Sequence, residues 1–311
     1  MGWKVVHLTK PCKIKIKSEN LLLHFYESDD EVKVTLKDID FLLFDNSQFS
    51  ITGKALELLA KNNIATLFID DTFHPSAILT PYLSHSLMSE TAHFQVSISQ
   101  EFKNQAWQKI VQRKIYNQAK VLEFFNNDAY IELEKLALGV QEYDKNGDEA
   151  QAARLYWKKI FNIRTFKRDK EGLDIINAML NYSYAIIRAS MARSVSASGL
   201  LPVFGLWHQN RYNAFNLVDD LMEVFRPFCD LHVKLLLDTK YQNRNNLTVN
   251  IKRDLVALLL SESVLINKGV SNISKSIELF VRQYKKAMIA DDALLLFFPE
   301  INREHFKDEF L

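Results

Sequence analysis

The stretch EFKNQAWQKIVQRKIYNQAKVLEFF, residues 101–125, marks the point where the hydrophobic pattern of the chain changes its period. Its apolar residues Trp107, Ile110, Val111, Ile115 and Ala119 recur three and four positions apart, which is the spacing of one face of an α-helix. The stretch therefore predicts a long amphipathic helix, and the chain before it has a different pattern from the chain after it.

Before residue 89 the apolar residues alternate with a period of two, which is typical of β-strands. Turn-forming groups of Ser, Asp and Asn separate the strands. A helix from Gly53 to Asn62, with Thr52 as its N-cap, interrupts this pattern. The strands are expected around residues 3–7, 12–16, 21–25, 32–36, 41–43 and 65–69.

After residue 89 the period stays close to 3.6, and residues 80–90 form the expected hinge. Residues 247–261 fit either a helix or a strand. The expected fold is a two-domain α+β protein: a small N-terminal β-sandwich-like domain with one helix, residues 1–88, and a larger, mainly α-helical domain, residues 89–311. Further helices are expected at 128–140, 148–162, 172–197, 216–239 and 273–290.

Composition limits the function only weakly. A chain of 311 residues with 48% hydrophobic content supports two ordinary cores. The net charge of +1 lacks the strongly basic balance of many nucleic-acid binders. However, residues 1–100 contain nine lysines, twelve acidic residues and no arginine, so every arginine, the better phosphate ligand, lies at or after Arg113.

Cys12 and Cys229 have no paired or metal-binding spacing, which favours reduced thiols. The N-terminus has no signal-peptide pattern, and no apolar run reaches the roughly 18 residues that span a bilayer. We expect a cytoplasmic protein without a membrane partner.

Three acidic or imidazole side chains lie at positions where the helical pattern favours apolar residues: Glu149, His208 and Glu223. Glu149 shares its predicted helix face with small and aromatic residues, and Glu223 lies one turn after Asp220 beside an apolar stripe. Because unpartnered buried carboxylates are costly, a shared cation is the simplest explanation.

Each of these residues also has an ordinary structural interpretation. Glu149 can be a helix N-terminal carboxylate or a partner of Arg154. A lone His208 can be a hydrogen-bonded structural histidine, and Asp220 with Glu223 can form a solvated face. Pro227 either kinks a helix beside Glu223 or begins a new helix.

Three runs of sequence resemble one family in order and spacing: GDEAQAARLYW (147–157), DIINAMLNY (174–182) and GLLPVFGLWH (199–208), followed by Asp220, Glu223 and Arg226-Pro227. Essentially end to end, the chain is similar to the CRISPR-associated endonucleases and integrases of the spacer-acquisition (adaptation) complex, the Cas-one family. The resemblance implies that the N-terminal domain forms a homodimer and the C-terminal domain is catalytic.

The same resemblance implies a metal-dependent DNA endonuclease and integrase that inserts captured DNA fragments (spacers) into a CRISPR array by 3′-hydroxyl attack on a phosphodiester. Glu149, His208 and Glu223 would be both catalytic residues and metal ligands, with Asp220 as an additional possible ligand. Carboxylate oxygens suit Mg²⁺ or Mn²⁺, and one imidazole favours Mn²⁺. Implied partners are double-stranded DNA and a small second adaptation protein that joins two homodimers into a heterohexamer.

Polar and aromatic residues near these motifs are candidates for DNA contacts, by stacking or by pairing with phosphate. An alternative function is a noncatalytic DNA-binding scaffold of the same fold. A hydrolase of small phosphate esters is a weaker alternative, because the eight glycines form no phosphate-binding loop. The candidate DNA-binding residues are Tyr156, Arg164, Asn177, Arg211 and Asn216.

Overall fold

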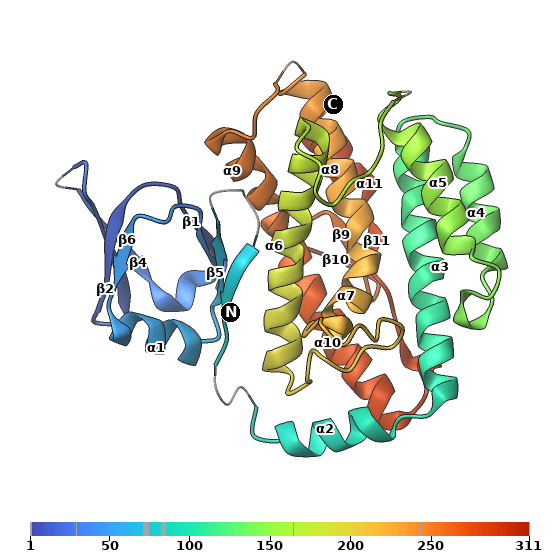
Figure 1. The fold of residues 1–311 in the computed structure, drawn as a ribbon, viewed down its shortest axis with the longest axis horizontal. Coiled ribbons are helices and arrows are strands. Elements are labelled where there is room, and N and C mark those ends of the chain that lie inside the picture. The colour runs from blue at the N-terminus through green and yellow to red at the C-terminus, as the bar shows by residue number, and fades with distance from the viewer. Residues whose placement is uncertain are drawn as a thin grey trace.

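The computed structural model describes residues 2–28, 30–70, 75–81, 85–163, 165–242 and 244–310. A β-rich N-terminal part lies beside a mainly helical C-terminal part, and helix α2 runs along the lower end of the helical part toward α3 (Figure 1). The mixed α+β class expected from the sequence is therefore confirmed. The domain boundary at residue 88 stays a prediction.

The N-terminal part contains two four-stranded sheets. One has the strand order β1-β5-β7-β8, with β1, β5 and β7 parallel, and the other has the order β4-β3-β2-β6. Helix α1 (Gly53–Lys61) begins after Thr52, whose side chain accepts a hydrogen bond from the Ala55 amide, as predicted. The strands are β1 Lys4–Leu8, β2 Cys12–Lys17, β3 Asn20–Phe25, β4 Glu31–Thr35, β5 Ile39–Phe44, β6 Phe49–Ile51, β7 Ala65–Ile69 and β8 Pro75–Leu79.

Strand β5 is buried on both faces, as its unbroken apolar run indicates. Leu42 and Phe44 belong to the core shared by the two sheets, while Phe41 and Leu43 belong to the core of the helical part. The first sheet is thus covered by the second sheet on one side and by helices on the other, which fixes the helical part against it.

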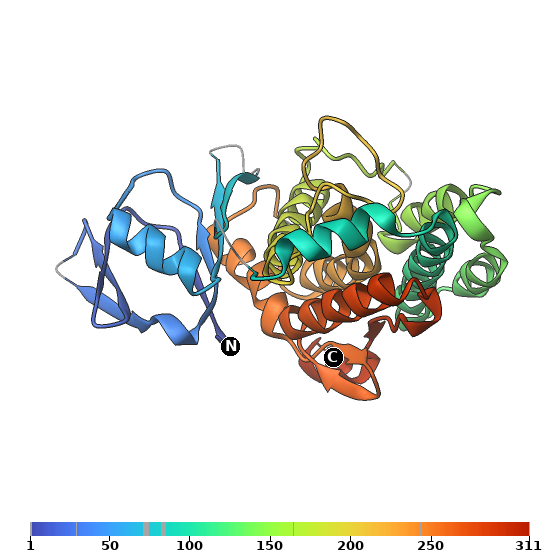
Figure 2. The ribbon, with the colours of Figure 1, turned by 90° about the horizontal axis from the view of Figure 1, so that it is seen from below.

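Helices make up most of the C-terminal part (Figures 1 and 2). Short 3₁₀ turns, η1 (Leu36–Asp38) to η5 (Ala293–Leu295), and a small sheet of β9 (Val264–Ile266), β10 (Gly269–Ser271) and β11 (Glu300–Ile301) complete the elements. The helices are α2 Met88–Ser97, α3 Gln100–Phe124, α4 Tyr130–Gly139, α5 Asp148–Ile160, α6 Ile175–Ala197, α7 Asn216–Met222, α8 Arg226–Thr239, α9 Val249–Ala257, α10 Ile273–Ala290 and α11 Arg303–Phe310.

The predicted helices are confirmed with small shifts at their ends, and the ambiguous stretch 247–261 contains helix α9. The predicted helix 216–239 is divided, because the 3₁₀ turn η3 (Glu223–Phe225) separates α7 from α8. Pro227 lies in the first turn of α8, where proline needs no amide hydrogen bond. It therefore begins a new helix, the second of the two alternatives.

A buried polar cluster fastens the first sheet to the helices. Asp45, at the end of β5, meets the Lys252 ammonium of α9 at 2.7 Å and the His7 imidazole of β1 at 2.9 Å. The Tyr182 hydroxyl of α6 donates to the same carboxylate at 3.3 Å. Cys12 and Cys229 are buried free thiols, as expected. Among the described residues, no helix is long and apolar enough to cross a membrane.

Candidate functional site

Glu149 is presented by the first turn of α5. Gly147 precedes the helix with a φ of +65°, a conformation that glycine adopts at little cost, and the Asp144 carboxylate accepts hydrogen bonds from the first amides of the helix. The Glu149 carboxylate is 2.5 Å from the Lys114 ammonium of α3. A position at the start of a helix is what the sequence predicted for Glu149, and its charged partner is Lys114 rather than Arg154.

Glu223 lies in the 3₁₀ turn between α7 and α8. Buried Asn117 of α3 donates to the carbonyl of the adjacent Val224 and so fixes this turn. The Glu223 carboxylate, only 8% exposed, meets Lys114 at 2.6 Å and Arg226 at 2.8 Å. Burial alone would raise the pKa of Glu223, but the two cations outweigh burial and lower the pKa to about 2.

Lys114 therefore joins two of the three predicted metal ligands, which come from separate elements. The sequence interpretation did not single it out, although a signal was present: Lys114 follows Ile110 and Val111 by four and three positions, on the apolar face of α3. Burial opposes its charge, yet Glu223 and Glu149 raise its pKa. A lysine on a buried helix face indicates a carboxylate partner.

His208 ends a loop that wraps around the Asp220 carboxylate. Amides of Leu206, Trp207 and His208 donate to Asp220, and the His208 Nδ1 lies 2.5 Å from its Oδ1. This hydrogen bond raises the pKa of His208, although partial burial opposes the rise. A side chain at Gly205 would come within 2.3 Å of the His208 carbonyl oxygen, so the tight loop requires glycine.

The sequence left open whether Asp220 is a ligand or supports a neighbour. Both of its oxygens accept hydrogen bonds from this loop, and it is fully buried, so the structure favours support. Because Asp220 holds Nδ1, the imidazole presents its Nε2 outward, as in carboxylate–histidine pairs at metal sites.

The donor set fits a hard divalent ion only in part. Two carboxylates already converge on one cation, which is the arrangement that Mg²⁺ or Mn²⁺ favours. Within the described parts of the chain, however, no three acidic, histidine or cysteine side chains are grouped closely enough to hold a metal ion. The three-ligand assignment therefore stays a prediction.

The DNA-contact prediction for Tyr156 is wrong. Tyr156 is fully buried and donates to the buried carboxylate of Asp230 at 3.0 Å, and Tyr184 of α6 donates to the same carboxylate. A ring enclosed in the core has no face on which a base can stack. The helical spacing of Tyr156 indicated core packing, and that was its correct interpretation.

Asn177 and Asn216 are also buried. Burial argues against a DNA contact for Asn177, whereas Asn216 lines the cavity beside His208 and its DNA contact stays a prediction. Asn177 accepts from Arg168 and from the Asp169 amide and donates to the Lys167 carbonyl, which orders the loop before α6. Asn216 donates to carbonyls of the loop before α7. These two polar residues on helix faces therefore form hydrogen bonds with loops of the same chain. Arg164 lies outside the described residues.

Arg211 remains a candidate DNA contact. It is exposed, and its guanidinium lies 4.7 Å from the centre of the Tyr212 ring. A cavity of about 450 Å³ opens beside it, lined also by His208, Lys103 and Phe204. Two cations therefore border the open side of the predicted ligand His208.

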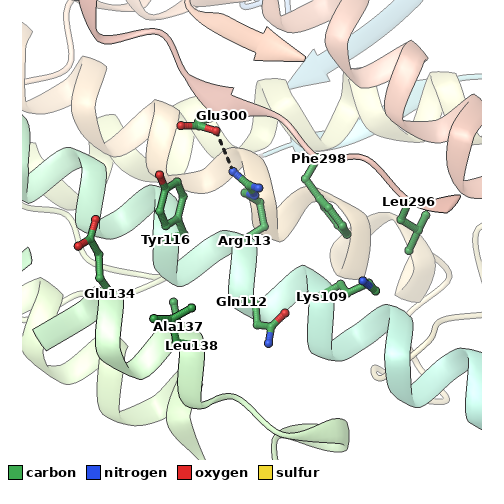
Figure 3. Close-up of a pocket in the computed structure, with 10 residues that line it drawn as sticks. All are labelled: Lys109, Gln112, Arg113, Tyr116, Glu134, Ala137, Leu138, Leu296, Phe298 and Glu300. Atoms are coloured by element: carbon green, nitrogen blue, oxygen red, sulfur yellow. Dashed lines mark hydrogen bonds and ion pairs between the residues drawn. The ribbon is translucent and has the colours of Figure 1, made fainter. Parts of the chain in front are cut away.

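A larger cavity, of about 550 Å³, lies elsewhere, between α3, α4 and the segment that leads into β11 (Figure 3). Arg113, which precedes Lys114, points into it and pairs with Glu300 at 3.2 Å. Arg113 thus points into the larger cavity, whereas its neighbour Lys114 contacts Glu149 and Glu223. The larger cavity is therefore a different place from the acidic site.

Comparison with known proteins identifies relatives along nearly the whole chain. Residues 6–264 match the family model of CRISPR associated protein Cas1. A CRISPR-associated endonuclease Cas1 from Neisseria meningitidis serogroup C (strain 8013) is 32% identical over 302 residues, 97% of each chain.

Two solved structures share the fold. A casposase bound to an integration product has a TM-score of 0.76 at 21% identity and covers 93% of this chain and 91% of its own. A Cas6-RT-Cas1–Cas2 complex contains a chain with a TM-score of 0.73 at 16% identity, covering 97% of this chain and 36% of that one. At such identities the likeness shows the fold.

Proposed function

Because the chain belongs to the CRISPR associated protein Cas1 family, we propose that it is a metal-dependent DNA endonuclease and integrase that inserts captured DNA fragments into a CRISPR array. The observation that carries this proposal is the meeting of Glu149 and Glu223, from separate elements, on one cation at 2.5 and 2.6 Å. Two carboxylates held together in this way are suited to divalent-ion phosphodiester chemistry.

In the proposed reaction, the 3′-hydroxyl oxygen of the captured fragment loses its proton and bonds to phosphorus, while a phosphorus–oxygen bond of the repeat strand breaks and its leaving 3′-oxygen takes up a proton. One phosphodiester replaces another, so no nucleotide energy source is required. Glu149, Glu223 and the Nε2 of His208 would hold the metal, which when bound supplies positive charge for the phosphate oxygens. Asp220 keeps the His208 ring oriented, and Arg226 holds one Glu223 oxygen in place.

The proposed partners follow from the family. Double-stranded DNA is the substrate, and the N-terminal sheets form a homodimer. The solved Cas6-RT-Cas1–Cas2 complex contains a Cas1–Cas2 assembly, so we extend a Cas2-type partner, and the heterohexamer built from it, to this chain as part of the proposal. Mg²⁺ or Mn²⁺ is the proposed cofactor.

The test is a joining assay with the protein, its Cas2-type partner, a short duplex with free 3′-hydroxyls and a plasmid that carries the repeat. We expect Glu149→Ala and His208→Ala to abolish the Mn²⁺-dependent joining while circular dichroism shows a retained fold. Glu300→Ala is a matched control, since Glu300 also pairs with a cation of α3 but faces the other cavity. It should join DNA at the wild-type rate.

The alternative, a noncatalytic DNA-binding scaffold, predicts a different result. If the wild type binds DNA but shows no metal-dependent joining, and the Glu149 and His208 variants bind DNA as the wild type does, the scaffold is favoured and the proposed enzyme is contradicted.

A further inference from the structure

Lys114 is enclosed between the two acidic residues that the proposed function assigns to the metal. Its side chain is 12% exposed, whereas Glu149 is 27% exposed, so the cluster reaches solvent on the Glu149 side. Its ammonium contacts both carboxylates at hydrogen-bonding distance. Without this cation, two carboxylates from different elements would face each other in a poorly solvated place, where like charges repel strongly.

Arg226 completes the charge balance. It contacts the other oxygen of Glu223 and stacks on the Tyr184 ring at 4.7 Å. Two carboxylates and two cations form a neutral set. A divalent ion placed between the carboxylates would add two positive charges beside Lys114, and like charges at such a distance repel each other.

Of the two resident cations, Lys114 is the one placed to move. Its ammonium lies between the carboxylates, where the divalent ion would have to bind, whereas the planar guanidinium of Arg226 is fixed from outside by the carboxylate and the aromatic ring. A lysine head group is carried on a flexible four-carbon chain, so it can leave without a backbone movement.

Resting on the proposed function, we infer that Lys114 is a resident counter-ion of the metal site: it holds Glu149 and Glu223 together while the metal is absent and is displaced from between them when a divalent ion binds. The metal and the lysine ammonium therefore compete for the same two carboxylates. Metal binding is then coupled to the position of Lys114.

The same helix provides a matched control. Lys120 also meets two carboxylates, Glu123 at 3.0 Å and Glu134 at 3.5 Å, and it is 18% exposed. Neither acid belongs to the candidate site. If an altered Mn²⁺ affinity reflects only the loss of a lysine between two acids, substitution of Lys114 and substitution of Lys120 should alter the affinity equally.

The first experiment measures Mn²⁺ binding to the full chain by isothermal titration calorimetry. Lys114→Met should bind Mn²⁺ at least about tenfold more tightly than the wild type, because no ammonium has to be displaced. Lys120→Met should bind Mn²⁺ as the wild type does. A purely structural role for Lys114 predicts unchanged or weaker binding in Lys114→Met, and that result would overturn the inference.

Removing a lysine that holds two carboxylates together can unfold the protein, so a second experiment uses the wild type alone. Reductive methylation with formaldehyde, read by mass spectrometry, reports how accessible each lysine amine is. Saturating Mn²⁺ should increase the labelling of Lys114 several-fold and leave Lys120 unchanged. Equal labelling of Lys114 with and without bound Mn²⁺ would show that the ammonium stays in place, contrary to the inference.

The outcomes separate this inference from the proposed function. If the wild type binds no Mn²⁺ at all, the proposed metal site is wrong and the role of Lys114 falls with it. If the wild type binds Mn²⁺ and joins DNA, but Lys114→Met gains no affinity and Lys114 gains no labelling, the proposed function stands and only the counter-ion role is rejected.

Discussion

Lys114, which is 12% exposed, and the buried Lys252 both meet carboxylates, but the two clusters around them are built in opposite ways. At the contact between the first sheet and the helices, one carboxylate, Asp45, is shared by Lys252, His7 and the Tyr182 hydroxyl. In the candidate site, one ammonium is shared by two carboxylates. The first cluster has one carboxylate at its centre, and the second has one ammonium between two carboxylates.

This difference shows which buried charge cluster can have a function beyond folding. A single carboxylate surrounded by donors is fully satisfied by its own chain and fastens two parts of the molecule. Two carboxylates around one monovalent cation can accept a stronger cation in its place. The position of the ammonium between two carboxylates, one of them the buried Glu223, therefore distinguishes the candidate site from the Asp45 cluster.

The largest effect should come from breaking the fastening cluster. Lys252→Met leaves Asp45 buried without its ammonium, which should lower the free energy of unfolding by about 3–5 kcal/mol. Urea denaturation measures the loss, and Mn²⁺ affinity of the folded protein should stay at the wild-type value. Lys240→Met, which removes an exposed ion pair with Asp254, should cost less than about 1 kcal/mol. Equal losses in the two variants would remove the structural role of the Asp45 cluster.

Low pH should weaken both charge clusters and so lower the free energy of unfolding. Glu223 of the candidate site should account for a measurable part of that loss. Because the folded pKa of Glu223 is about 2 and an unfolded glutamate titrates near pH 4.3, its stabilisation is complete above that pH and is lost as the pH falls toward 2. The loss is roughly 3 kcal/mol. The pKa of Asp45 is also lowered, since His7 and Lys252 outweigh burial, and its contribution has the same sign.

The measurement is the free energy of unfolding as a function of pH. Glu223→Gln should show a shallower decline than the wild type below about pH 4.3. Glu300→Gln is the control, because its ion pair with Arg113 lies in the other cavity and is more exposed. Parallel acid profiles for the wild type and Glu223→Gln would mean that Lys114 and Arg226 do not stabilise the Glu223 carboxylate.

Local patterns predicted the elements well, whereas partners distant in sequence were not predicted. The period of α3 and the Thr52 cap depend on neighbouring residues, so the sequence was enough to identify them. The three-residue strand β6 and the small sheet of β9, β10 and β11 were missed because such short strands carry little pattern. The five-residue strand β8, which begins at a proline, was missed as well. The burial of Tyr156, Asn177 and Asn216 was missed because it depends on the packing of distant segments.

The candidate site shows the same limit. The family motifs placed Glu149 and Glu223 in one site, and both do contact Lys114. Lys114 lies outside those motifs, on a helix that the sequence had already predicted, and its role became visible only when its two partners were placed beside it. An ionisable residue on an apolar helix face is the signal to look for in such sequences.

The smallest effect on stability should come from an exposed cation outside both clusters. Arg211 lies over the exposed Tyr212 ring beside the His208 cavity, so Arg211→Ala should change the free energy of unfolding by no more than about 0.5 kcal/mol. If Arg211 contacts a DNA phosphate, the variant should bind duplex DNA more weakly, and the slope of log affinity against log salt should fall by about 1. Fluorescence anisotropy over a salt series measures the DNA affinity and its salt slope.

Arg188→Ala is the contrasting variant, because Arg188 is held by Asp219 at 2.6 Å and its loss should reduce stability instead. An unchanged salt slope in Arg211→Ala would leave this side of the His208 cavity without a phosphate contact from Arg211.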